Sequence, residues 1–125
     1  MVFEIKEVKT PNIDYCFYDE DAIFYLEIQK DNEIIGTISV HKHPEDKTGG
    51  QVGIEIEEKW RKKWLSRNVV KNIMTKLIEV SRRYELSILY SVALSDISPR
   101  LLEFFGFKEY YLKIPKTYYY IQFAR

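Results

Sequence analysis

The sequence predicts a single α/β (α+β) domain with one mixed, mostly antiparallel sheet around a central parallel strand-helix-strand unit. Residues 51–57, QVGIEIE, alternate apolar and polar side chains as a half-buried strand does. Residues 66–84 keep apolar side chains at helical spacing, and residues 88–94, ILYSVAL, are an apolar run of strand length. A strand, a helix and a strand in this order favour a right-handed parallel crossover.

The other segments predict antiparallel strands around this unit. Five of them are rich in residues that favour strands: 2–8, 22–29, 34–40, 107–114 and 117–124. Asp31 and Asn32 are typical of the turn of one hairpin, Pro115 and Lys116 separate the last two strands, and residues 41–50 predict a polar loop.

A short helix is predicted before the last hairpin. Ser98 is a suitable N-cap, Pro99 suits the first helical position, LLEFF fills the helix, and Gly106 provides a left-handed stop.

Length and charge narrow the classes of function. The 125 residues predict one domain, 1–125, and the 19 basic and 19 acidic side chains cancel. Bulk charge therefore favours neither nucleic acid nor an anionic membrane as partner. The single Cys16 excludes an intrachain disulfide and is interpreted as a core residue. The first residues are charged and do not resemble a signal peptide or a membrane span. We therefore expect a cytoplasmic setting.

The stretch EKWRKKWLSR, residues 58–67, connects the strand to the long helix and has two interpretations. It is either an anion-binding loop at a helix N-terminus or the solvated entrance of an amphipathic helix. Trp60 and Trp64 are equally typical of side chains that seal the core beneath a helix start.

Residues 51–110 resemble the GCN5-related N-acetyltransferase (GNAT) superfamily as a divergent member. SPRLLEFFGFKEY, residues 98–110, is similar to the family's short helix that ends in a Gly-Phe step before a strand. Residues 61–66 occupy the frame of the family's Q/R-x-x-G-x-G/A loop, with Trp64 where the pattern has Gly.

The resemblance implies acetyl-CoA as co-substrate, an amine as acceptor and a loop that holds the CoA diphosphate. The cofactor-binding residues that it implies are Ile56, Glu57, Arg61, Lys62, Lys63, Trp64, Leu65, Ser66 and Arg67. An oxyanion would be held by a backbone N–H near Ile56 or Glu57.

The catalytic residues of the family match less well. The position of its frequent acid Tyr is Leu102, and that of its frequent Asn is Ser95, so neither role transfers. Tyr110, or Tyr111, is the substitute candidate for the acid. Glu55 and Glu57 are the candidate bases, with solvated strand carboxylates as the alternative interpretation.

His41 and His43 share the spacing of a metal-binding pair, but no third ligand is evident and no metal site is predicted. Residues 1–22 leave little room for the helices that the family places after its first strand. The acceptor side is then open, which suits a protein or peptide amine, or is completed by another chain, as in a homodimer.

Two functions therefore follow from the sequence. One is an acetyl-CoA-dependent N-acetyltransferase that acts on a protein, a peptide or a small amine. The other is a GNAT-like fold that has lost catalysis and serves as an interaction or assembly module, as in some phage-encoded proteins; Trp64, Leu102 and Ser95 favour it. A nucleic-acid binder has little support because the basic run is short.

Overall fold

The computed structural model describes residues 3–9, 22–60, 66–93, 102–103, 105–113 and 116–123. Its elements, in chain order, are β1 (Phe3–Val8), β2 (Ala22–Lys30), β3 (Glu33–Lys42), β4 (Gly49–Ile56), the 3-10 helix η1 (Glu58–Trp60), α1 (Arg67–Arg83), β5 (Ile88–Ala93), β6 (Lys108–Lys113) and β7 (Lys116–Gln122). They form a seven-stranded sheet in the order β1-β2-β3-β4-β5-β7-β6. Among the described strands, only β4 and β5 pair in parallel, which confirms the predicted mixed sheet.

The hairpin β2–β3 forms where the sequence predicts it. Asp31 and Asn32 both have positive φ, 50° and 66°, as a two-residue turn between right-twisted strands requires.

The predicted polar loop 41–50 is too long. His41 pairs with Gln51 and Lys42 with Gly50, so β3 continues further and β4 begins earlier than the apolar pattern suggests. Gly50 looks like a loop residue, but its role is close packing: a Cβ there would lie 2.6 Å from Val40 Cγ1.

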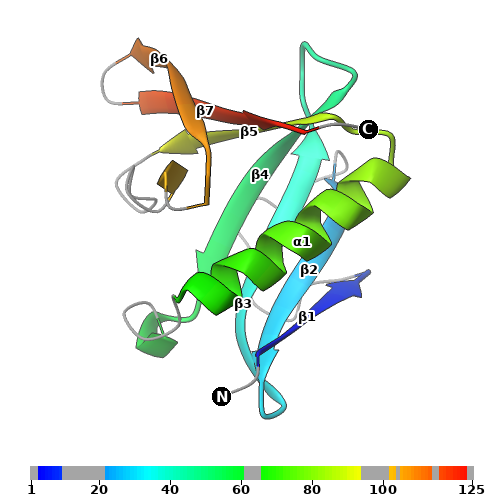
Figure 1. The fold of residues 1–125 in the computed structure, drawn as a ribbon, viewed down its shortest axis with the longest axis vertical. Coiled ribbons are helices and arrows are strands. Elements are labelled where there is room, and N and C mark those ends of the chain that lie inside the picture. Colours follow the sequence, from blue (N-terminus) through cyan, green and yellow to red (C-terminus); the bar gives the residue numbers. More distant parts are fainter. Residues whose placement is uncertain are drawn as a thin grey trace.

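Helix α1 confirms the most regular pattern of the sequence. Ser66 is its N-cap and Tyr84 its C-cap. The buried side chains of the helix are Val69, Val70, Ile73, Leu77, Val80 and Ser81. The apolar residues of this group belong to one core with Val52 and Ile56 of β4. Figure 1 shows α1 lying across β2, β3 and β4.

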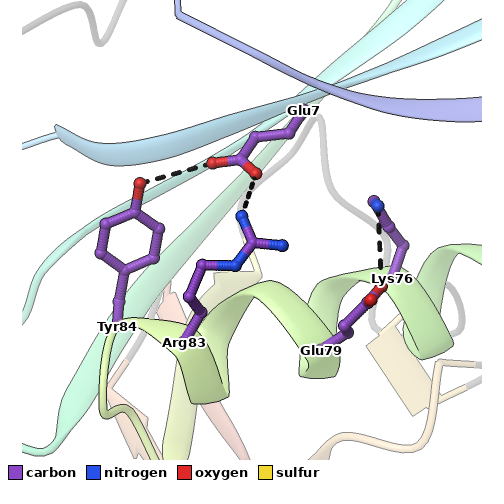
Figure 2. A network of polar contacts seen from close by, with 5 residues as sticks. All are labelled: Glu7, Lys76, Glu79, Arg83 and Tyr84. Carbon is purple, nitrogen blue, oxygen red and sulfur yellow. Dashed lines mark hydrogen bonds and ion pairs between the residues drawn. The ribbon is translucent and has the colours of Figure 1, made fainter.

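The C-terminal end of α1 is tied to the edge strand β1 (Figure 2). Arg83 Nη1 lies 2.6 Å from Glu7 Oε1, and the Tyr84 hydroxyl donates to Glu7 Oε2 at 3.4 Å. The Tyr84 ring also stacks on Phe24 at 5.5 Å. These contacts orient the helix across the sheet.

The last part of the chain follows the prediction, and the structure adds the order of its strands in the sheet. Gly106 has φ 93° and ends the helical turn that contains Leu102, as predicted, whereas Ser98, Pro99 and Cys16 lie outside the described residues. Strands β6 and β7 form the expected hairpin, and β7 lies between β5 and β6.

Candidate functional site

Strands β4 and β5 meet at one end and then diverge. Their register consists of Gly49↔Ile88, Gly50↔Leu89 and Gln51↔Tyr90. Beyond these positions, no further pairing joins the two strands within the described ranges. In Figure 1, β4 and β5 start side by side and then point in different directions.

A hydrogen bond from a β5 side chain follows the last backbone pair of β4 and β5. The Ser91 hydroxyl donates to the Val52 carbonyl at 3.2 Å, and this contact is buried. It satisfies the first β4 carbonyl after the paired segment.

The backbone of β4 presents alternate residues to its two neighbours. The Glu57 N–H, just after the strand, donates to the Ile35 carbonyl at 2.8 Å, whereas the Val52 carbonyl faces Ser91. Consecutive strand residues direct their N–H and C=O groups to opposite edges of the strand. The backbone groups of Ile54 and Ile56 therefore point toward the side of β5, beyond the last β4–β5 pair. Of the two predicted oxyanion donors, the Glu57 amide is already bonded to β3.

The predicted anion loop falls mostly outside the described residues. Arg61, Lys62, Lys63, Trp64 and Leu65 are in this group, so their roles stay predictions.

The flank of this loop at the start of α1 lies in the described part of the chain. Ser66 Oγ accepts from the Val69 N–H at 3.3 Å, which caps α1, and both Ser66 and Arg67 are exposed. The first turn of α1 has no acidic residue, so no carboxylate offsets the partial positive charge of the helix N-terminus. The flank that the structure shows therefore suits an anion.

Glu55 and Glu57, the two candidate bases, lie in different environments. Glu55 is in β4, is partly buried and pairs in register with Thr37 of β3, on the face opposite α1. Glu57 follows the strand and is exposed. The solvated interpretation thus fits Glu57 better than Glu55.

A polar row on this face was missed by the sequence analysis. Glu27, Thr37 and Glu55 are neighbours across β2, β3 and β4, and Glu27 is 1% and Thr37 0% exposed. Gln29 Nε2 donates to Glu27 Oε1 at 2.5 Å, while Thr37 Oγ1 has no hydrogen-bond partner among the described residues. Polar residues between the apolar ones in all three strands were the available signal.

Tyr110 lies at an irregularity of β6. Glu109 pairs with Tyr119 and Tyr111 with Tyr118, so Tyr110 is the extra residue of a β-bulge. Because β7 separates β6 from β5, Tyr110 is not on the strand next to the divergence. Leu102 is fully buried in the core, as expected of a residue without the family's acid role, and Ser95 lies outside the described residues.

Trp60 has the structural role that its place before the helix predicts. Its ring packs against the core, and its Nε1 donates to Glu33 Oε2 at 2.5 Å. Lys59 Nζ lies 2.8 Å from the same oxygen. The hydrogen bonds from Lys59 and Trp60 lower the pKa of Glu33 below its ordinary value.

His41 and His43 each contact polar groups close to them in the sequence. His41 Nε2 lies 3.0 Å from Ser39 Oγ, whereas His43 Nδ1 accepts the N–H groups of Glu45 and Asp46. Within the described ranges, no group of three or more His, Cys, Asp or Glu side chains is arranged to hold a metal.

The loop after β3 has its own polar cluster. The Tyr90 hydroxyl donates to Asp46 Oδ2 at 2.6 Å, and Thr48 donates to Asp46 Oδ1 through its N–H and its hydroxyl. The Tyr90 bond, and then those from Thr48, lower the pKa of Asp46. This cluster fixes the end at which β4 and β5 meet.

No helix in the described part of the chain is long and apolar enough to span a lipid bilayer.

Comparison with known proteins gives a family and a fold. The model of the acetyltransferase (GNAT) family matches residues 2–107. A comparison with curated protein sequences finds no match.

Three solved structures illustrate the fold. N-acetyltransferase PseH of Campylobacter jejuni, in complex with acetyl coenzyme A, superposes with TM-score 0.62 at 15% identity, over 85% of this chain and 71% of PseH. Ribosomal-protein-S5-alanine acetyltransferase of Vibrio fischeri gives 0.60 at 18% identity, over 82% and 62%. The GNAT domain of S. lividans PAT gives 0.63 at 10% identity, over 82% and 61%. This chain thus spans less than two thirds of the last two.

Proposed function

Because this chain belongs to the acetyltransferase (GNAT) family, we propose that it is an acetyl-CoA-dependent N-acetyltransferase that transfers an acyl group to an amine. One observation supports the proposal most: β4 and β5 stop pairing after Gln51–Tyr90. Beyond that point, Ile54 directs its backbone groups toward the side of β5, with which β4 no longer pairs in the described ranges. An amide-rich chain such as the pantetheine arm suits such an edge, because it pairs like a strand.

The residues at the start of α1 suit the diphosphate end of the cofactor. In this proposal, the diphosphate binds at Ser66 and Arg67 together with Arg61, Lys62, Lys63, Trp64 and Leu65. The absence of an acidic residue from the first turn of α1 supports this placement.

The transfer needs a neutral amine and a stabilised oxyanion. The amine nitrogen attacks the thioester carbonyl carbon, the C–S bond breaks, and the thiolate takes up a proton to leave as a thiol. We assign the base that accepts the ammonium proton, directly or through water, to Glu55 rather than Glu57, because Glu55 lies within β4. The Ile56 amide is the proposed oxyanion donor and Tyr110 the candidate acid.

The proposed acceptor is a protein, a peptide or a small amine, and a second copy of the chain is a candidate partner. The single cysteine supports a reducing, cytoplasmic setting, and the balanced charge supports the absence of a nucleic acid or membrane partner.

A second candidate is a catalytically inactive interaction module. Leu102 favours it, since the position where the family often has an acid Tyr holds a fully buried aliphatic side chain. The fold would then be kept and the chemistry lost.

Two measurements separate the candidates. Calorimetry with acetyl-CoA, combined with the melting temperature at millimolar ligand, tests binding, since a ligand of the native state must raise the melting temperature. Release of free thiol with a panel of amines tests transfer. Arg61→Ala should weaken binding, whereas Lys47→Ala, an exposed cation before β4, should not. Absence of any melting shift contradicts the enzyme, and binding without thiol release favours the inactive module.

A further inference from the structure

A buried hydroxyl on β3 lies between two carboxylate residues of the neighbouring strands. Thr37 is directly opposite Glu27 of β2 on one side and Glu55 of β4 on the other. Thr37 is fully buried, and its Oγ1 has no hydrogen-bond partner among the described residues. Such a hydroxyl lowers the stability of the folded state, because it has given up its hydrogen bonds to water. Valine has nearly the same shape and no hydroxyl, so threonine at this position needs a reason other than stability.

Of the two carboxylate neighbours, Glu55 is the one that Thr37 suits. Glu27 is buried and already accepts a hydrogen bond from Gln29 Nε2, at 2.5 Å. Glu55 is only partly buried, so its carboxylate is open in part to an incoming amine. Directly opposite residues of an antiparallel pair have Cβ atoms about 4.5–5.5 Å apart. A Glu55 side chain that turns toward β3 therefore comes within reach of the Thr37 hydroxyl.

We propose that Thr37 is a positioning residue for the base: its hydroxyl donates a hydrogen bond to the Glu55 carboxylate in the complex with the substrates. This inference rests on the proposed function, which assigns the base to Glu55. A carboxylate has two oxygens, so a bond that holds one of them directs the other toward the ammonium proton. Bonds of this kind often tighten only when the substrate binds.

Ser39 provides an internal comparison for Thr37. It lies on the same strand and the same face and is also fully buried, but its neighbours in register are Tyr25 and Gly53, neither of which has a carboxylate. Ser39 Oγ lies 3.0 Å from His41 Nε2. The hydroxyl of β3 that lacks a described partner is thus the one beside the candidate base. Buried polar groups that lower stability are typical of functional sites.

The test uses the full chain with acetyl-CoA and three acceptor amines: spermidine, glucosamine and a peptide with a free N-terminus. With the amine that reacts fastest, Thr37→Val should lower kcat about tenfold, as expected for one lost hydrogen bond to a charged group. Acetyl-CoA affinity, measured by calorimetry, should be unchanged. The same variant should melt about 3 °C higher than wild type, because valine removes an unpaired buried hydroxyl. A residue with a structural role alone would not lower kcat while it raises stability.

Two single variants and one double variant complete the design. Thr37→Ser keeps the hydroxyl and should retain kcat within about threefold. Ser39→Ala removes a buried hydroxyl that has no carboxylate opposite it, and should retain the wild-type kcat. In the Glu55→Gln background, Thr37→Val should cause no further loss of kcat, since both substitutions act on the same contact.

Each outcome decides a different part of the account. Wild-type kcat in Thr37→Val, or the same loss of kcat in the Glu55→Gln background, overturns the positioning role alone. If Thr37→Val does not fold, equal kcat in Thr37→Ala and Thr37→Ser overturns it instead. Wild-type kcat in Glu55→Gln overturns the base assignment and this inference, but leaves acetyl transfer in place. A chain that does not bind acetyl-CoA, or releases no thiol with any of the amines, overturns the proposed function as well.

Discussion

Glu55 and Glu57 are two residues apart, yet the strand gives them different surroundings. Glu55 is partly buried beside Thr37, and Glu57 is exposed after the strand ends. A general base needs a fixed position near the proton that it accepts, so β4 favours Glu55.

Glu55→Gln should lower kcat about a hundredfold with acetyl-CoA affinity unchanged, because a carboxamide cannot accept the ammonium proton. Steady-state kinetics and calorimetry measure the two quantities. Glu57→Gln is the matched control and should keep kcat within about threefold. The reverse result, with Glu57 as the sensitive position, would contradict the assignment.

Asp46 makes the stability of the chain depend on pH. Its ordinary pKa is 3.8, and the Tyr90 bond, followed by the Thr48 bonds, lowers it in the folded state. A carboxyl whose pKa is lowered on folding stabilises the protein above its unfolded pKa. That contribution is lost as the pH falls through the folded pKa.

Tyr90→Phe should therefore lower the free energy of unfolding by about 1 kcal/mol at pH 7, the value for a solvent-screened hydrogen bond to a charged group. The difference from wild type should shrink as the pH falls below 3.8. Urea unfolding at pH 7, 5 and 3 measures it. A difference that stays constant over this range would show that the charge of Asp46 plays no part in the contribution of the Tyr90 hydroxyl.

At the scale of elements, Ser66 caps α1 and also belongs to the proposed diphosphate site. The hydroxyl caps the helix, and the same N-terminus is the proposed diphosphate site. A substitution that keeps the cap but changes the charge separates the two roles.

Ser66→Ala should lower the free energy of unfolding by about 1 kcal/mol through loss of the cap. Ser66→Asp should restore stability, since Asp caps as well as Ser, but should weaken CoA affinity roughly tenfold through repulsion of the diphosphate. Chemical unfolding and calorimetry on both variants test this pair. Equal CoA affinity in Ser66→Asp and wild type would place the diphosphate elsewhere.

The elements themselves were mostly predictable from local patterns. Helix α1, the turn at Asp31 and Asn32, and the stop at Gly106 each depend on residues close in sequence, and each is confirmed. Long-range features were not predictable. Strand β7 rather than β6 pairs with β5, and a bulge places Tyr110 out of register, because the alternating pattern of a strand does not name its partner.

The candidate site was only partly predictable for the same reason. Glu55 was identified from its strand, but its neighbours Glu27 and Thr37 come from two other strands. The bond from Trp60 to Glu33 joins two residues that no motif connects. Such contacts follow from the tertiary arrangement of the sheet.

At the scale of the whole molecule, the sheet consists of two parts that meet at the start of β4 and β5. The network of Asp46 and Tyr90 fixes the meeting point, Ser91 ends the ladder, and the strands then diverge. We propose that a cofactor binds along β4 where the two strands diverge.

An NMR titration of the ¹⁵N-labelled chain with acetyl-CoA tests this claim most directly. We expect the largest amide shifts at Ile54, Ile56 and Ser66, with smaller shifts at Gly53 and Glu55, whose backbone groups face β3. Absence of shifts at millimolar acetyl-CoA, or shifts equal on both edges of β4, would contradict binding between the diverging strands.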